Sequence, residues 1–156
     1  MPAPAPTVQV TDPRTFFPGV WQIDRRVHDA RARTDGTYVG TATFLVEGEG
    51  LSWTERGELR LGDYVGRTSR VMRVLPVPPA RADGAPRGAA PWEVRFDDGR
   101  PFHPLDLRGG SCPVDHPCGE DHYAGWVRVE SEDLLVVSWR VTGPRKDHTI
   151  LSRYTR

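Results

Sequence analysis

The chain has 156 residues, the length of one ordinary domain, which is enough to bury about two-thirds of the unfolded surface without disulfides or metals. Its 21 acidic side chains balance its 21 basic ones, and the basic residues are spread along the sequence, which excludes the concentrated basic surface typical of nucleic-acid or anionic-membrane binding. The sequence also lacks a signal peptide and an apolar run of about 20 residues, so we expect a cytoplasmic protein with free thiols at its two cysteines.

Apolar and polar residues alternate with a period of two along most of the chain, which predicts β-strands and no long helix. Residues 1–15 are expected to form a flexible N-terminal segment before a single domain over 16–156. The expected strands are, in chain order, 20–28, 37–47, 50–61, 64–76, 92–98, 101–107, 122–130, 133–142 and 146–155. Short turns rich in Gly, Asp and Ser favour consecutive pairing, which predicts an all-β fold: a single antiparallel, lipocalin-like up-and-down barrel of eight to ten strands.

One long connection interrupts this regular order. Between Pro76 and Pro91 the residues are mainly Pro, Ala, Gly and Arg, and no periodic pattern survives. We expect a mobile loop there, at one mouth of the barrel. Residues 109–121 are also expected to form a loop, and the two loops together are predicted to mark the open end.

Alternation also assigns side chains to the two faces of each strand. On consecutive strands it places Phe44, and then Trp53 and Glu55, inside the barrel. A carboxylate in an apolar interior is costly unless it is paired or serves a purpose. Arg70, expected to point inward from the next strand, is a candidate partner. Three alternatives stay open: a structural ion pair, a carboxylate that faces a ligand, and simple exposure near a bulge.

The two ends of the domain carry a tryptophan and an arginine in matching places. Gly19-Val20-Trp21 opens the first expected strand after a Pro-containing turn, and Arg153 lies in the last one. Together these features resemble the calycin superfamily, which includes the lipocalins. In that superfamily a first-strand Trp packs under a last-strand Arg at the closed end of the barrel, which is a cation–π contact. The resemblance therefore implies that Trp21 and Arg153 close one end.

Three longer blocks have a specific order and spacing. They are Phe-Asp-Asp-Gly-Arg-Pro-Phe-His at 96–103, His-Pro-Cys-Gly-Glu-Asp-His-Tyr at 116–123 followed by Gly125, and Trp-Arg-Val-Thr-Gly-Pro-Arg-Lys-Asp at 139–147. From about residue 16 to the end, the chain resembles a bacterial family, the domain of unknown function 6314 family. The resemblance implies a fold but no activity, and it implies that the second block matters. This chain departs from the family pattern at His122 and at its extra Cys112.

Titratable side chains are densest between Ser111 and Tyr123. The set comprises Cys112, Asp115, His116, Cys118, Glu120, Asp121, His122 and Tyr123. One hypothesis is a metal-binding protein, in which Cys112, His116 and Cys118 bind zinc through the 112–122 loop with Asp121 or His122 as a fourth ligand. The spacing matches no familiar zinc motif, so we assign no metal ligands.

A second hypothesis is a cofactor-independent acid–base enzyme of the isomerase, cyclase or lyase type. Its base would be Glu55 or Asp121, and its acid Tyr123 or His116, because a carboxyl of raised pKa beside a histidine is what proton transfer near neutral pH requires. The same residues are equally compatible with a site that only orients a ligand, or with side chains that merely satisfy one another. The sequence alone does not decide between these alternatives.

The favoured hypothesis is that the barrel binds a small, partly apolar organic molecule in its interior, without a redox cofactor or nucleic acid. Aromatic side chains that line a barrel supply apolar contact, and a few polar groups orient the ligand. Beside the four residues named as an acid–base set, the expected ligand-binding residues are Arg70, His103, Trp53, Phe44, Trp139 and Cys118.

Overall fold

The computed structural model describes residues 6–78 and 90–156 of the chain. In this part a single helical turn, α1 (Pro13–Phe16), precedes ten β-strands. The strands are β1 (Gly19–Asp29), β2 (Thr34–Glu47), β3 (Gly50–Leu61), β4 (Tyr64–Pro76), β5 (Trp92–Phe96), β6 (Pro101–Leu105), β7 (Ser111–Cys118), β8 (Asp121–Ser131), β9 (Leu134–Thr142) and β10 (Asp147–Thr155). Among the described residues no helix has the length and apolar character needed to cross a membrane.

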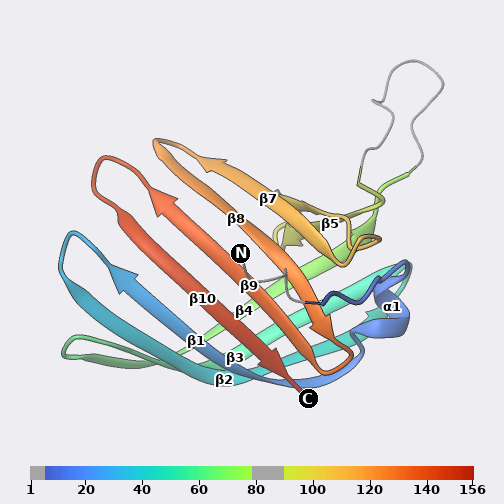
Figure 1. Cartoon of the computed structure of the whole chain (residues 1–156), viewed down its shortest axis with the longest axis horizontal. Helices are drawn as coiled ribbons and strands as arrows, with labels where there is room; N and C mark the ends of the chain where they lie inside the picture. The colour runs from blue at the N-terminus through green and yellow to red at the C-terminus, as the bar shows by residue number, and fades with distance from the viewer. Residues whose placement is uncertain (1–5, 79–89) are drawn as a thin grey trace.

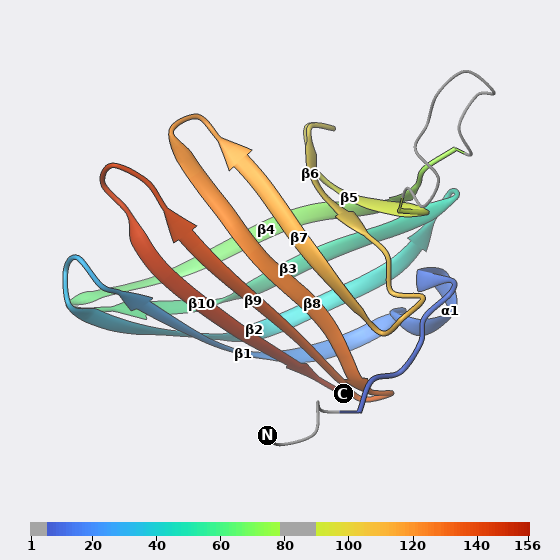
Figure 2. The same cartoon turned by 45° about the horizontal axis from the view of Figure 1, so that its top comes forward.

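All ten strands belong to one antiparallel sheet, whose hydrogen-bonded order is β6-β5-β4-β3-β2-β1-β10-β9-β8-β7. Strands that follow each other in the chain are therefore paired, with the exception of β6 and β7. In addition, the last strand, β10, pairs with the first, β1. The sheet curls until its two end strands, β6 and β7, come into contact, which forms a nearly closed barrel (Figures 1 and 2). The predicted all-β, antiparallel up-and-down barrel is confirmed.

We call the junction between β6 and β7 the seam. The two strands lie against each other, but no ladder of hydrogen bonds joins them in the described part of the chain. The N-terminal segment crosses the seam at one end, because the Val8 N–H donates to the Val129 carbonyl and the Val10 N–H to the Leu107 carbonyl, both at 2.8 Å. Val10 is buried. Residues 1–5 of the segment expected to be flexible lie outside the described residues.

The strand β7 corrects the prediction of a loop over residues 109–121. Pro113 and Pro117 interrupt the strand pattern in the sequence, because proline has no N–H to donate to a ladder. An edge strand tolerates proline, since only one of its sides is paired. Residues Ser111–Cys118 accordingly pair with β8 alone.

Inward-facing side chains fill the barrel as alternation predicts. Phe44, Trp53 and Glu55 are all buried, and the Phe44 ring packs against that of Trp53 at a tilt of 31°, with 5.0 Å between the centroids. Phe17, just after α1, stacks on the other side of Phe44 at 5.0 Å. This end of the barrel is therefore a packed aromatic core.

Trp21 closes this end, but its cation is not the one that the resemblance implied. The guanidinium carbon of Arg156 lies 4.2 Å from the centroid of the Trp21 ring, and Arg156 Nη1 donates to the Phe16 carbonyl at 2.7 Å. Arg153 is exposed, because alternation turns it outward between the buried Ser152 and Tyr154. The assignment of Arg153 was therefore wrong, and Arg156 makes the contact.

The long connection after β4 leaves the barrel at the same end. Arg14, in α1, lies over the ring of Trp92 at 5.3 Å, which places the start of β5 beside the helix that covers Trp21. The prediction that this connection marks the open end was wrong, because an up-and-down order puts every second turn at the same end. Of the connection expected to be mobile, residues 79–89 lie outside the described residues.

We expect Arg156→Ala to lower the free energy of unfolding by about 1–3 kcal/mol, because it removes the cation–π contact with Trp21 and hydrogen bonds to the Phe16 and Glu132 carbonyls. Arg153→Ala removes the same kind of side chain from the outer face and should change the free energy of unfolding by less than about 0.5 kcal/mol. Urea denaturation measures both. Equal effects of the two substitutions would contradict the assignment of Arg156.

Candidate functional site

A cavity of about 110 Å³ lies inside the barrel, beyond the aromatic core. Its lining is Arg25, Trp53, Arg70, Met72, Phe102, His103, Tyr123, Val127, Val137, Trp139, Ile150, Ser152 and Tyr154. Most of these side chains are aromatic or aliphatic, and four polar ones gather on one wall: Arg25, Arg70, Ser152 and Tyr154. An engineered cavity of about 150 Å³ in another protein holds benzene, so a volume of this order suits a single ring.

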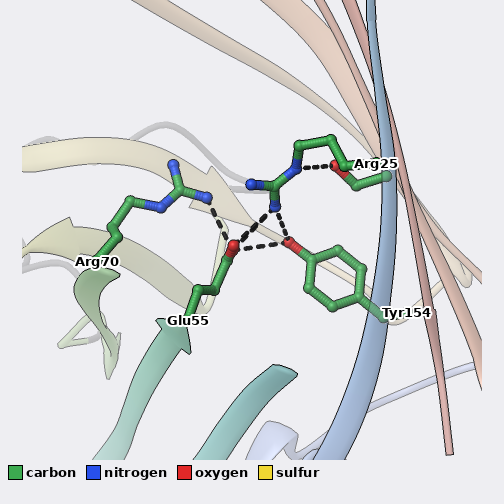
Figure 3. Close-up of polar contacts among 5 residues, drawn as sticks. Arg25, Glu55, Arg70 and Tyr154 are labelled. Carbon is green, nitrogen blue, oxygen red and sulfur yellow. Dashed lines mark hydrogen bonds and ion pairs between the residues drawn. The ribbon is translucent and has the colours of Figure 1, made fainter. Parts of the chain in front are cut away.

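The polar wall is built around the Glu55 carboxylate, which is 1% exposed (Figure 3). Arg25 Nη2 donates to both of its oxygens, at 2.7 Å and 3.2 Å. Arg70 Nη2 and the Tyr154 hydroxyl donate to Oε1, at 2.8 Å and 2.9 Å. Of the three alternatives left open by the sequence, the pairing of Glu55 with Arg70 is therefore present, and simple exposure is excluded.

Arg25 is the cation that sequence reasoning missed. Its Nε donates to the Ser152 hydroxyl at 2.7 Å, and its Nη2 also donates to the Tyr154 hydroxyl at 2.9 Å. Alternation from the buried Trp21 and Ile23 points residue 25 inward, so the signal was present in the sequence. The same rule places Ser152 and Tyr154 inside.

These contacts fix the protonation of the polar wall. Burial alone would raise the pKa of Glu55, but Arg70 and Arg25 outweigh it, so the pKa lies below the usual range and the carboxylate is ionised. Burial, reinforced by the nearby Glu55 carboxylate, raises the pKa of the Tyr154 phenol, which stays neutral. The wall thus carries two fixed positive charges and one negative charge.

A group of stacked rings forms the opposite wall. Phe102 of β6 and Trp139 of β9 stack in parallel, with centroids 5.3 Å apart, and so bridge the seam between β6 and β7. Tyr123 meets Trp139 edge-on at 6.2 Å. His116 of β7 packs edge-on against Phe102 at 5.1 Å and against Tyr123 at 5.9 Å. At the seam, the strands are therefore held together by packed aromatic side chains, whereas the other strands are joined by ladders of hydrogen bonds.

His103 adds a neutral polar group to the cavity. Its Nδ1 lies 2.7 Å from the Pro104 carbonyl, so the proton sits on Nδ1 when the ring donates to that oxygen. Burial lowers the pKa of His103 to about 4, which keeps the imidazole neutral at pH 7. Nε2 is then an acceptor.

Trp53 carries an unsatisfied donor. The side chain lines the cavity and is 8% exposed, and its Nε1 is the one buried side-chain nitrogen or oxygen without a hydrogen-bond partner among the described residues. A buried polar group left unpaired costs about 1–3 kcal/mol. The described part of the protein therefore leaves this buried donor beside the cavity without a partner.

The predicted site residues fall into two groups in space. Trp53, Arg70, His103, Tyr123 and Trp139 line the cavity, and Glu55 and His116 contact residues of the lining. The other three belong neither to the lining nor to the polar wall or the ring cluster beside it: Phe44, Asp121 and Cys118.

Each of those three has another place in the fold. Phe44 belongs to the packed core beneath Trp53. Asp121 lies at the start of β8, where its carboxylate pairs with Lys146 Nζ at 3.0 Å. Cys118 is exposed at the end of β7.

The strand conformation of residues 111–118 also bears on the zinc hypothesis. Cys112 and Cys118 are six residues apart on one extended strand, which separates them by roughly 20 Å. Cys112 is buried, with its thiol 3.3 Å from the Asp106 N–H, whereas Cys118 is exposed. Within residues 6–78 and 90–156 no three His, Cys, Asp or Glu side chains are placed to hold a metal ion together. The geometry therefore does not support a zinc site in this segment.

Comparison with known proteins gives a family and a fold. A family model described as "Family of unknown function (DUF6314)" matches residues 17–156. No curated protein sequence matches the chain.

Among solved structures, the chain is similar to the S-type phycobiliprotein lyase CPES from Guillardia theta, with a TM-score of 0.62 and 12% identity over 96% of this chain and 93% of that one. It is also similar to a de novo designed fluorescence-activating β-barrel (TM-score 0.45, 16% identity, 94% and 99% covered) and to the redesigned β-barrel mFAP1 bound to DFHBI (TM-score 0.42, 9% identity, 94% and 100% covered). At such an identity the likeness to the lyase shows the fold alone, and it agrees with the predicted β-barrel.

The buried His103 predicts a pH dependence of stability. Its folded pKa of about 4 lies below the unfolded value of 6.5, so its contribution is complete above pH 6.5 and is lost as the pH falls towards 4. Between those values the wild type should lose up to about 3 kcal/mol more than His103→Asn, which cannot titrate. Urea denaturation at a series of pH values measures the difference, and parallel curves for the two proteins would refute it.

Proposed function

This chain belongs to the DUF6314 family, and we propose that it binds a small, partly apolar organic molecule inside its barrel. The observation that carries the proposal is the cavity with aromatic walls on one side and fixed hydrogen-bonding groups on the other. Apolar lining with a few convergent polar groups is the usual composition of a small-molecule site.

The buried Trp53 N–H adds a second argument for a ligand. Native proteins pair nearly all of their buried polar groups, so an unpaired donor at a cavity calls for an acceptor from outside the chain. An apolar ring lying against Trp139 and an acceptor atom at Trp53 would use both walls. We propose that Trp53, Arg70, His103, Tyr123 and Trp139 contact the ligand.

The acid–base alternative has less support from the same contacts. A general base works best when its pKa is near the working pH, whereas Glu55 has a lowered pKa and is held by three donors. Asp121 is paired with Lys146 away from the cavity lining. His103 is a weak base, because burial lowers its pKa to about 4. The residues are therefore better arranged to hold a molecule than to move a proton.

Filling the cavity should abolish binding. Val137 lines it, so Val137→Phe places a ring where the ligand would lie, whereas Val39→Phe adds the same ring to the outer face at a residue that is 64% exposed. We expect native mass spectra of the wild type and of Val39→Phe to show a co-purified organic adduct or the uptake of added benzamide. Val137→Phe should show neither, while its circular dichroism stays that of the folded barrel.

Two results would overturn the proposal. One is that wild type, Val39→Phe and Val137→Phe all fail to take up any small molecule. The other is that Val137→Phe binds benzamide as well as the wild type does, which would place binding outside this cavity.

A further inference from the structure

The polar wall of the cavity carries one positive charge more than it can neutralise. Arg25 and Arg70 are both ion-paired with the same carboxylate, that of Glu55. None of the described residues that line the cavity is acidic, so Glu55, just behind the lining, is the one carboxylate that pairs with them. His103 and Tyr154 are neutral, so they do not change the balance. Arg70 is partly exposed, so solvent screens part of this excess, while Arg25 holds its charge beside the apolar lining of the cavity.

Glu55 cannot serve both cations fully. Its two oxygens already accept from three side chains, and Arg25 and Arg70 each give it a single nitrogen, Nη2. Arg25 Nη1, and the Nη1 and Nε of Arg70, have no protein partner among the described residues. Figure 3 shows the two guanidinium groups on either side of the Glu55 carboxylate. A guanidinium presents its N–H groups as a planar fork that matches a carboxylate.

The two arginines also stand where a ligand would enter. A second hollow of about 360 Å³ shares Arg25 and Arg70 with the inner cavity, and the rest of its lining is Val27, Tyr38, Glu55, Leu59, Thr68 and Ser69. Arg70 is 44% exposed at its side chain, whereas Arg25 is 15% exposed. The free N–H groups are therefore reachable from solvent and adjoin the aromatic walls.

From this arrangement, and resting on the proposed function, we infer that the ligand is a carboxylate carried on a planar ring. Its ring lies between Trp53, Tyr123 and Trp139, and its carboxylate accepts from the free N–H groups of Arg25 and Arg70. The negative charge of the ligand neutralises the second positive charge of the two arginines, which Glu55 alone does not balance. A neutral ring of the same shape would fill the cavity but leave that charge unpaired.

Benzoate and benzamide test the inference, because they have the same shape and differ in charge. Isothermal titration calorimetry of the wild type should give at least tenfold tighter binding of benzoate. Arg70→Gln should weaken benzoate about tenfold or more, and it should weaken benzoate by a clearly larger factor than benzamide, because only benzoate loses a charge-assisted hydrogen bond. Arg73→Gln is the matched control: the same change three residues along β4, at an arginine that pairs with Glu47 and Asp97 instead. It should alter neither affinity.

Glu55→Gln should change the affinity for benzoate in the opposite direction. Removing the internal carboxylate should raise the affinity for benzoate, since it leaves the two arginines with no other anion. Because Arg70 is partly exposed, Arg70→Gln keeps the fold and decides the question alone if Glu55→Gln does not fold.

The outcomes separate the inference from the proposed function. Equal affinities for benzoate and benzamide, both lost in Val137→Phe, would overturn the inference that the ligand carries a carboxylate. Small-molecule binding in the cavity would still stand. A preference for benzoate that survives Arg70→Gln would overturn the role of the arginines. Failure of both compounds to bind the wild type, with no co-purified adduct, would overturn the proposed function itself.

Discussion

The buried carboxylate of Glu55 is the interaction on which the interior of this barrel depends. Its partners come from three other strands: Arg25 from β1, Arg70 from β4 and Tyr154 from β10. A carboxylate that is 1% exposed is stable only with such partners, so the four side chains fix one another's positions. They also divide the interior into a packed aromatic end and a cavity with a polar wall.

The period-two pattern was sufficient to predict the architecture, because a strand has only two faces. It placed Phe44, Trp53 and Glu55 inside and turned Arg70 toward the cavity, and it gave the order of the antiparallel strands. It failed for β7, where prolines hide the alternation. Alternation within one strand does not predict contacts between strands that are not neighbours. The pairing of Arg25 with Glu55, whose strands are separated by β2, could therefore not be predicted from it.

The dense block of titratable residues at 111–123 was a weaker guide to the site. Successive residues of a strand point to opposite faces, so groups that are close in the sequence separate in space. His116 and Tyr123 reach the ring cluster, while His122 pairs with Asp115 on exposed side chains. The cavity instead collects residues scattered from Arg25 to Tyr154, each inward-facing on its own strand.

The seam has a consequence for the behaviour of the protein at high concentration. Strands with unpaired backbone groups can recruit the strands of another molecule and so start aggregation. Here each of the two edge strands carries two prolines: Pro101 and Pro104 in β6, and Pro113 and Pro117 in β7. The missing N–H groups remove donors that a ladder between β6 and β7 would need, and they deny the same donors to a foreign strand. The barrel thus forgoes complete closure and is protected against polymerising edge to edge.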